Sequence, residues 1–124
     1  KLNKSEKINV IRDDLKSIFS NLLSNAIKYK SEEREQKITI SSKIENENYK
    51  IIFSDTGIGI DMNSSKDKIF KIFSRLHPHR NISGSGVGLY IVKKQVMRNQ
   101  GTIEINSKVN EGTSFIITLP NISN

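Results

Sequence analysis

The sequence predicts an α+β fold: a two-layer α/β sandwich in which a mixed sheet of about five strands carries about three helices on one face. Two observations predict it. Segments with alternating apolar and polar residues form two hairpin pairs, and between them lie segments whose apolar residues recur at helical spacing. A chain of 124 residues suffices for one hydrophobic core but not for two, so residues 1–124 are expected to form a single domain.

The bulk composition is that of an ordinary globular chain. Apolar residues make up 35% and charged residues 27%, which excludes a disordered or membrane-embedded protein. No apolar run approaches the roughly 20 residues that span a bilayer. The absence of cysteine excludes disulfides and thiolate metal sites and fits the expected cytoplasmic location of the domain. The abrupt polar ends indicate a fragment of a longer protein, whose membrane anchorage stays open.

The net charge of +7 raises nucleic acid as a partner. The Lys and Arg residues are scattered, however, and no basic block is interleaved with base-stacking aromatic residues. Attraction to small polyanionic ligands accounts for the charge equally well. We therefore expect no nucleic-acid partner and no membrane contact by this domain.

The first elements are a strand and a long amphipathic helix. Lys7–Arg12 alternates and predicts a strand, Asp13 is a fair N-cap, and Asp14–Tyr29 predicts the helix. Ser31–Gln36 is a charged loop. The apolar stripe of the helix comprises Leu15, Ile18, Phe19, Leu22, Leu23 and Ala26.

Beside this stripe lie Asn21, Asn25 and Lys28, at i, i+4 and i+7. Asparagine is a mediocre residue for a helix interior because its amide competes for backbone groups. Two explanations fit this stretch taken alone. The amides are surface groups, or they project into a cleft, offer oxygen ligands to a hard cation such as Mg²⁺ and leave Lys28 to face an anion.

The remaining strands are expected as two hairpins. Lys37–Glu45 pairs with Tyr49–Ser54, and Thr102–Val109 pairs with Thr113–Leu119 across a turn that contains glycine. Between the hairpins, Lys66–Leu76 predicts a short helix.

Glycines mark two further points along the chain. Gly57 and Gly59 follow a strand and favour a tight turn or a close backbone approach to a ligand. Gly84–Gly88 leads into the helix expected at Leu89–Asn99, which Gly101 would end as its C′ residue. A glycine-rich entry to a helix N-terminus is suited to binding phosphate.

Five blocks occur in a characteristic order: NLLSNAIKY, DTGIGI, KIFKIFSRL, GSGVGLYIVKK and EGTSFIITLP. Each block is weak evidence by itself, and the chain contains neither a P-loop nor a dinucleotide fingerprint. Together they closely resemble the ATP-binding catalytic domain of sensor histidine kinases. That domain has the Bergerat-type ATP-binding fold shared with DNA gyrase B, heat-shock chaperone ATPases and MutL-type repair ATPases. The resemblance runs from about Lys7 to Pro120.

The resemblance implies roles for the first helix. Asn25 would be the Mg²⁺ ligand, and Asn21, one turn earlier, would assist at the phosphates or the metal. Lys28 would contact phosphate, and Tyr29 would lie near the adenine and ribose. Asn21, Asn25 and Lys28 are therefore the expected catalytic residues.

The resemblance also implies a base-binding end. Asp55 would accept the exocyclic amine of adenine, which discriminates adenine from guanine because a carboxylate cannot pair with a keto oxygen. Gly57 and Gly59 would let the backbone approach the base, and Ile60 would line the pocket. Thr113 would support the contact between Asp55 and adenine.

A lid over the triphosphate is implied as well. Gly84, Gly86 and Gly88 would form its hinge, and Val87 and Leu89 would belong to the same nucleotide-binding segment. Three further side chains have open roles, as lid anchors or core aromatics for Phe70 and Phe73, and as a γ-phosphate ligand or a surface cation for Arg75.

The implied function is to bind ATP with Mg²⁺ and to donate the γ-phosphoryl group to a histidine in two-component signal transduction. The motif around a phospho-accepting histidine is missing, and His77 and His79 lack its context. The acceptor would therefore be a separate dimerisation domain of a homodimeric parent, which would pass the phosphoryl group to a response regulator. The alternatives are an ATP-hydrolysing relative, which would carry Glu at the position of Asn21, a catalytically silent nucleotide-binding module and a nucleic-acid binder.

Overall fold

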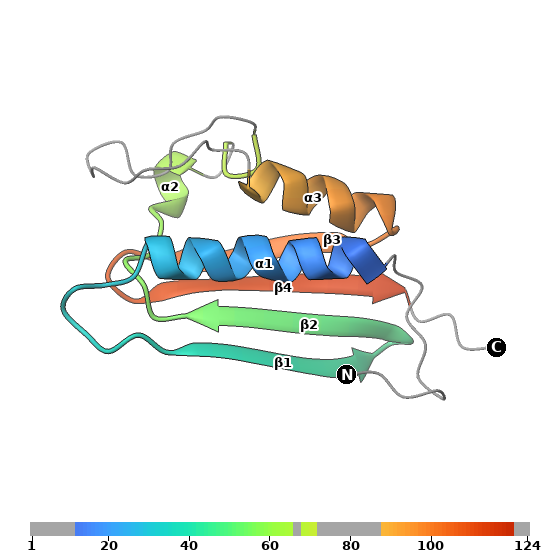
Figure 1. The fold of residues 1–124 in the computed structure, drawn as a ribbon, viewed down its shortest axis with the longest axis horizontal. Coiled ribbons are helices and arrows are strands. Elements are labelled where there is room, and N and C mark those ends of the chain that lie inside the picture. Colours follow the sequence, from blue (N-terminus) through green and yellow to red (C-terminus); the bar gives the residue numbers. More distant parts are fainter. Residues whose placement is uncertain (1–11, 66–67, 72–87, 121–124) are drawn as a thin grey trace.

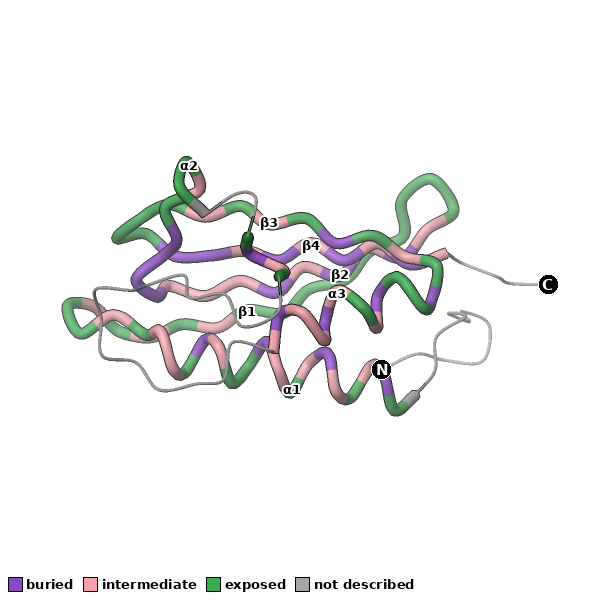
Figure 2. Tube along the Cα trace, turned by 90° about the horizontal axis from the view of Figure 1, so that it is seen from above, coloured by how far each residue is buried: buried purple, intermediate pink, exposed green. Residues whose placement is uncertain are grey.

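The computed structural model describes residues 12–65, 68–71 and 88–120, and these residues form two layers (Figure 1). One layer is a β-sheet. The helices α1 (Arg12–Lys28) and α3 (Gly88–Arg98) cover one face of it, as the view from above also shows (Figure 2). The expected α+β sandwich is confirmed. No helix in the described part of the chain is long and apolar enough to cross a bilayer.

The sheet consists of the two expected hairpins joined side by side. Within the described residues it has four strands in the order β1-β2-β4-β3, and every pairing is antiparallel. The expected first strand lies outside these residues, except for Arg12, which begins α1 instead; the fifth strand and the mixed sheet stay predictions. The strands are β1 (Ile38–Glu45), β2 (Asn48–Asp55), β3 (Thr102–Lys108) and β4 (Gly112–Pro120).

The hydrophobic core lies between the sheet and the two helices. Side chains alternate between the faces of a strand, so each central strand turns one apolar set toward the helices. Leu23, which we expected on the buried stripe of α1, is instead 44% exposed. The core comprises Ile51 and Phe53 of β2, Phe115, Ile117 and Leu119 of β4, Ile18, Leu22 and Ala26 of α1, and Leu89, Val92 and Val96 of α3, among others.

A polar clamp joins the start of α1 to the end of α3. α1 begins at Arg12, so Asp13 lies in its first turn rather than capping it. Asp14 is buried and accepts hydrogen bonds from both the Nε (3.0 Å) and the Nη2 of Arg98, and from the Nδ2 of Asn99 (2.8 Å). Hydrogen bonding to Arg98 lowers the pKa of the Asp14 carboxyl below its ordinary value.

The end of α3 corrects the expected role of Gly101. Gln100, with φ 64°, is the left-handed residue, and the Gly101 N–H donates to the Val96 carbonyl at 2.9 Å, as in a Schellman motif. Gly101 is needed for a different reason. A Cβ there would lie 2.5 Å from the Thr118 carbonyl oxygen of β4.

The segment after β2 also differs from the prediction. A one-turn helix, α2, occupies Met62–Ser65. Of the helix expected at Lys66–Leu76, residues 68–71 form turns and a bend, and the rest lies outside the described residues. Phe70 packs against the core, which supports its assignment as a core aromatic.

Candidate functional site

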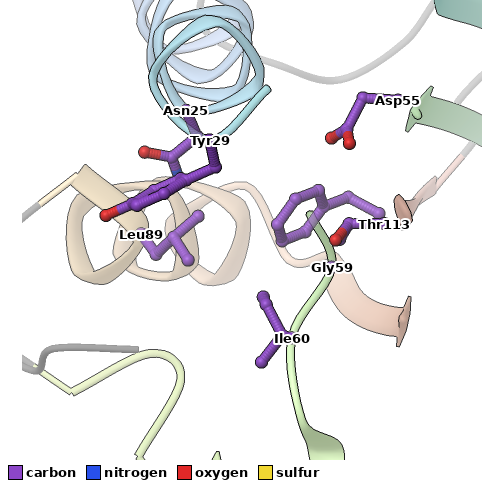
Figure 3. A pocket seen from close by; sticks show the side chains of 8 residues that line it. Asn25, Tyr29, Asp55, Gly59, Ile60, Leu89 and Thr113 are labelled. Atoms are coloured by element: carbon purple, nitrogen blue, oxygen red, sulfur yellow. The ribbon is translucent and has the colours of Figure 1, made fainter. Parts of the chain in front are cut away.

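A hollow lies where the end of α1, the end of β2, the loop after β2, the start of α3 and the start of β4 meet (Figure 3). In that view Asn25 of α1 and Tyr29, directly after α1, lie on one side, and Asp55 and Thr113 lie opposite. The residues predicted from the sequence include every lining residue except one, the core aromatic Phe115. The lining residues are Asn25, Tyr29, Asp55, Gly59, Ile60, Leu89, Thr113 and Phe115.

The side-chain amide of Asn21 is oriented by its own helix. The Asn21 Nδ2 donates to the carbonyl of Ser17, one turn earlier, at 3.0 Å. The amide oxygen of Asn21 therefore points elsewhere, and it lies 3.4 Å from where a Cβ on Gly88 would be. Asn21 thus directs an acceptor to the first residue of α3, while Asn25 lines the hollow one turn further along α1.

Lys28 occupies the last turn of α1 and is half-buried. Its Nζ lies 5.8 Å from the centroid of the Tyr29 ring, within range of a cation–π contact. Because Tyr29 lines the hollow, this places the ammonium group beside the site.

Asp55 provides the carboxylate of the site. It is the last residue of β2, paired in register with Thr113 of β4. Its Oδ1 accepts the Gly57 N–H at 2.8 Å. Burial raises the pKa of the Asp55 carboxyl, and backbone hydrogen bonds from Gly57 and Thr113 oppose that rise. A partly desolvated acceptor is thereby held at the edge of the hollow.

The glycines after Asp55 are required by contacts within the protein. A Cβ on Gly57 would lie 2.5 Å from the Tyr29 carbonyl oxygen. Gly59 has φ +78°, and a Cβ there would lie 1.9 Å from the Lys108 carbonyl oxygen. From the sequence, both were expected at a tight turn or at a close backbone approach to a ligand, and the resemblance implied that this ligand is the adenine base. The structure gives them a packing role, and only Gly59 is among the lining residues named above.

Ile58, between these glycines, ties the loop to both of its neighbours. Its N–H donates to the Tyr29 carbonyl at 2.9 Å, and its carbonyl accepts the Asn110 N–H at 2.8 Å. The loop is therefore fixed between the end of α1 and the β3–β4 turn.

Arg34 supports the site although it was not among the residues predicted from the sequence. From the α1–β1 loop its Nε donates to the Thr56 carbonyl at 3.0 Å, and its Nη2 donates to the Gly57 carbonyl. The Thr56 hydroxyl bonds back to the same loop, accepting from the Lys37 N–H and donating to the Glu35 carbonyl. Nothing in a charged loop distinguishes such an arginine from a solvated one, so the sequence carried no signal for it.

Ser107 of β3 was not predicted either. Its Oγ accepts the Ile60 N–H at 2.8 Å, donates to the Gly112 carbonyl at 2.9 Å and lies 2.7 Å from the Thr113 Oγ1. Ser107 therefore connects two lining residues, Ile60 and Thr113. Its place on the inward face of a strand, where apolar residues dominate, was the available signal.

Several predicted residues lie outside the described part of the chain. They include most of the expected lid, and their roles stay predictions. Gly88 and Leu89, at the start of α3, are described. The residues outside are Phe73, Arg75, His77, His79, Gly84, Gly86 and Val87.

The donor set can be tested against a bound metal. Among the described residues no group of three or more His, Cys, Asp or Glu side chains gathers as a metal site. On the α1 side of the hollow the available oxygen ligands are the side-chain amides of Asn25 and, beside it, Asn21, and the Asp55 carboxylate lies on the opposite side. A few protein oxygens supplemented by water and phosphate are what Mg²⁺ usually accepts, so these residues fit Mg²⁺ bound together with a polyphosphate.

The hollow has two chemically different ends. Asp55 accepts hydrogen bonds at one end, and at the other end lies the N-terminus of α3, where the helix dipole favours negative charge. An apolar wall of Ile60, Leu89 and Phe115 joins them. On a two-layer α+β sandwich, these features define the class of nucleotide-binding ATPase domains.

Comparison with known proteins identifies the family. Residues 11–122 match the family described as Histidine kinase-, DNA gyrase B-, and HSP90-like ATPase, and the chain belongs to this family. The expected histidine-kinase type is confirmed, because the matching proteins include sensor kinases and solved catalytic domains of histidine kinases.

The relatives are much longer than this chain. It is 42% identical over 106 residues to Cyanobacterial phytochrome A of Nostoc sp., covering 86% of this chain and 14% of that protein. It is 37% identical over 110 residues to Sensor protein RprX of Bacteroides fragilis, and the match covers 87% of this chain and 21% of that protein. The chain therefore spans about a seventh to a fifth of these relatives.

Solved structures agree on the fold. The catalytic domain of histidine kinase ThkA, in a nucleotide-free form, superposes with a TM-score of 0.72 at 28% identity, covering 90% of this chain and 68% of that chain. Mycobacterial sensor histidine kinase MprB superposes with a TM-score of 0.82 at 23% identity, and the match covers 96% of this chain and 80% of that chain. At that identity the second likeness shows the fold alone.

Proposed function

We propose that this chain is the ATP-binding catalytic domain of a protein-histidine kinase, and that it donates the γ-phosphoryl group of ATP to a histidine on a separate dimerisation domain. The observation that carries the proposal is that Asn25, Asp55 and the start of α3 meet at one hollow although they lie far apart in the sequence. Family membership supports the ATP-binding part. The acceptor histidine, the response regulator and a homodimeric parent are further parts of the proposal.

Each wall of the hollow has a task in this proposal. Asp55 would accept the exocyclic amine of adenine, and Tyr29 and Ile60 would pack beside the base. Asn25, assisted by Asn21, would hold Mg²⁺, which when bound neutralises phosphate charge. Lys28, Gly88 and the N–H groups that follow would face the phosphates. Transfer then needs positioning and charge neutralisation more than covalent participation by the protein.

The test is calorimetric titration of the isolated chain with ATP, GTP and a non-hydrolysable ATP analogue, with and without Mg²⁺. We expect ATP and the analogue to bind, Mg²⁺ to strengthen that binding, and GTP to bind at least about tenfold more weakly. Asn25→Ala should abolish the Mg²⁺-dependent part. Leu23→Ala, on the same helix but exposed, is the matched control and should bind as the wild type does. Equal affinity for ATP and GTP would overturn the assignment of Asp55.

A further inference from the structure

Ser107 makes three contacts through a hydroxyl that carries one hydrogen. A serine hydroxyl donates once and accepts twice. The Ile60 N–H can only donate, so Ser107 accepts it. The Gly112 carbonyl can only accept, so the hydrogen of Ser107 is used there.

This count fixes the direction of the third contact. With its one hydrogen on the Gly112 carbonyl, Ser107 can only accept from the Thr113 hydroxyl, 2.7 Å away. The hydrogen of Thr113 therefore points to Ser107, away from any ligand, and the lone pairs of the Thr113 Oγ1 remain for other partners. The buried position of Thr113, 8% exposed, limits exchange with water.

The consequence concerns the wall of the hollow. Asp55 and Thr113 lie in register on neighbouring strands, and Figure 3 shows the Thr113 oxygen on the same side of the hollow as the Asp55 carboxylate. A carboxylate and an acceptor-only hydroxyl together present lone pairs and no hydrogen. Such a wall attracts an amine and repels a keto oxygen.

We propose that Ser107 is a specificity-determining positioning residue, which holds the Thr113 hydroxyl as an acceptor and so strengthens selection of a 6-amino purine over a 6-keto purine. The inference rests on the proposed ATP-binding function and deepens it. Ser107 need not touch the ligand. Its hydrogen bonds to the backbone of Ile60 and Gly112 fix the position of the Ser107 hydroxyl. Because that hydroxyl has only one hydrogen, it leaves Thr113 to act as the donor in the bond between them.

The test compares ATP with inosine triphosphate, which carries a keto oxygen in place of the amine and a hydrogen on N1, where adenine has a lone pair. Titration gives the ratio of the two dissociation constants for wild type and Ser107→Ala. Without Ser107 the Thr113 hydroxyl can turn its hydrogen toward the keto oxygen, so we expect the preference for ATP to fall about fivefold, the value of one ordinary hydrogen bond. Ser107→Thr keeps the hydroxyl and should retain the wild-type ratio.

Two further measurements separate this role from a general structural one. Ser114→Ala removes a comparable hydroxyl pair, Ser54 with Ser114 at 2.8 Å, and should leave the ratio unchanged. In a Thr113→Val background, Ser107→Ala should no longer alter the ratio. Ser107→Cys is measured in parallel in case the alanine variant does not fold, because cysteine is similar in size to serine. It should also reduce the preference for ATP.

The outcomes are distinct. If Ser107→Ala weakens ATP and inosine triphosphate equally, Ser107 is only structural and the inference is wrong, while the proposed function stands. If the wild-type chain binds neither nucleotide, the proposed function fails and the inference fails with it.

Discussion

Asp55 is a residue whose burial lowers stability at neutral pH. Burial raises the pKa of its carboxyl in the folded protein. For such a group, the stabilising contribution is fully present below the unfolded-state pKa and is lost as the pH rises through the folded-state pKa. At neutral pH the ionised Asp55 carboxylate is therefore unfavourable for folding. A carboxylate at this position fits the proposed role in binding.

Replacing this residue should separate the two properties. We expect Asp55→Asn at pH 7 to leave the melting temperature of the nucleotide-free chain unchanged or higher, and to remove the rise in melting temperature that ATP causes in the wild type. Thermal unfolding with and without ATP checks both. Glu111→Gln, an exposed carboxylate on the β3–β4 turn, is the control. A large loss of stability in Asp55→Asn without ATP would contradict the sign of the pKa shift.

Gly59 is the residue whose replacement should disturb the hollow most directly. Its φ is positive, and a Cβ would approach the Lys108 carbonyl oxygen to 1.9 Å, so there is no space for a side chain. We expect Gly59→Ala to lower the free energy of unfolding by about 2 kcal/mol or more, measured by urea denaturation. Gly88→Ala is a useful comparison, because a Cβ there would meet the Asn21 Oδ1 at an ordinary 3.4 Å, so the fold should tolerate it.

At the scale of the elements, the α1–β1 loop stabilises the turn that follows β2. Arg34 holds the carbonyls of Thr56 and Gly57, directly after Asp55. We expect Arg34→Ala to lower the free energy of unfolding by about 1 kcal/mol and to weaken ATP binding severalfold, because the turn that orients Asp55 loosens. Arg34→Lys should restore part of the loss. Lys30→Ala, an exposed cation in the same loop, should change neither quantity in urea denaturation and titration.

The clamp between α1 and α3 predicts a pH dependence of stability that is opposite in sign to that of Asp55. Hydrogen bonding to Arg98 lowers the pKa of Asp14 from 3.8. Its contribution to stability is therefore present above the unfolded-state value and is lost as the pH falls through the lower folded-state value. We expect Asp14→Asn to destabilise the protein at pH 7 and to remove part of the loss that the wild type suffers below about pH 4. Denaturation across this range checks it, and Asp13→Asn, the exposed neighbour, should follow the wild type.

On the scale of the whole molecule, much of the fold was predictable because its patterns are local. The two hairpins and both long helices came within about two residues of their observed bounds, since period-2 and helical alternation are set along the chain. Side-chain contacts between segments far apart in the sequence were not predictable. Arg34 donates to the backbone carbonyl of Thr56, and the Ser107 hydroxyl accepts the backbone N–H of Ile60; these partners lie 22 and 47 residues away, and no spacing in the sequence records them.

The roles of the glycines illustrate the same limit. Gly101 was expected as the left-handed cap, but Gln100 holds that conformation and Gly101 makes room for β4. The sequence marks a glycine without saying whether conformation or proximity requires it.

These 124 residues should supply the donor half of the reaction only. We expect slow ATP hydrolysis by the isolated chain, because Asn21 cannot act as a general base, and phosphoryl transfer only when an acceptor dimerisation domain is added. Asn21→Glu should raise hydrolysis about tenfold or more, whereas Asn21→Gln should not. Release of inorganic phosphate measures both. Rapid hydrolysis by the wild type would favour the ATP-hydrolysing alternative.

The bonds of Ile58 have a practical consequence. The Ile58 N–H donates to the Tyr29 carbonyl and the Ile58 carbonyl accepts the Asn110 N–H, so this residue connects the segment after α1 to the β3–β4 turn. The Asp55 end of the hollow is thus held in place by contacts within the protein, and if it binds adenine as proposed, little ordering entropy would be lost there on binding. A flat heterocycle without phosphates would gain most of its affinity per atom at this end, which makes it the place to begin the design of a competitive inhibitor.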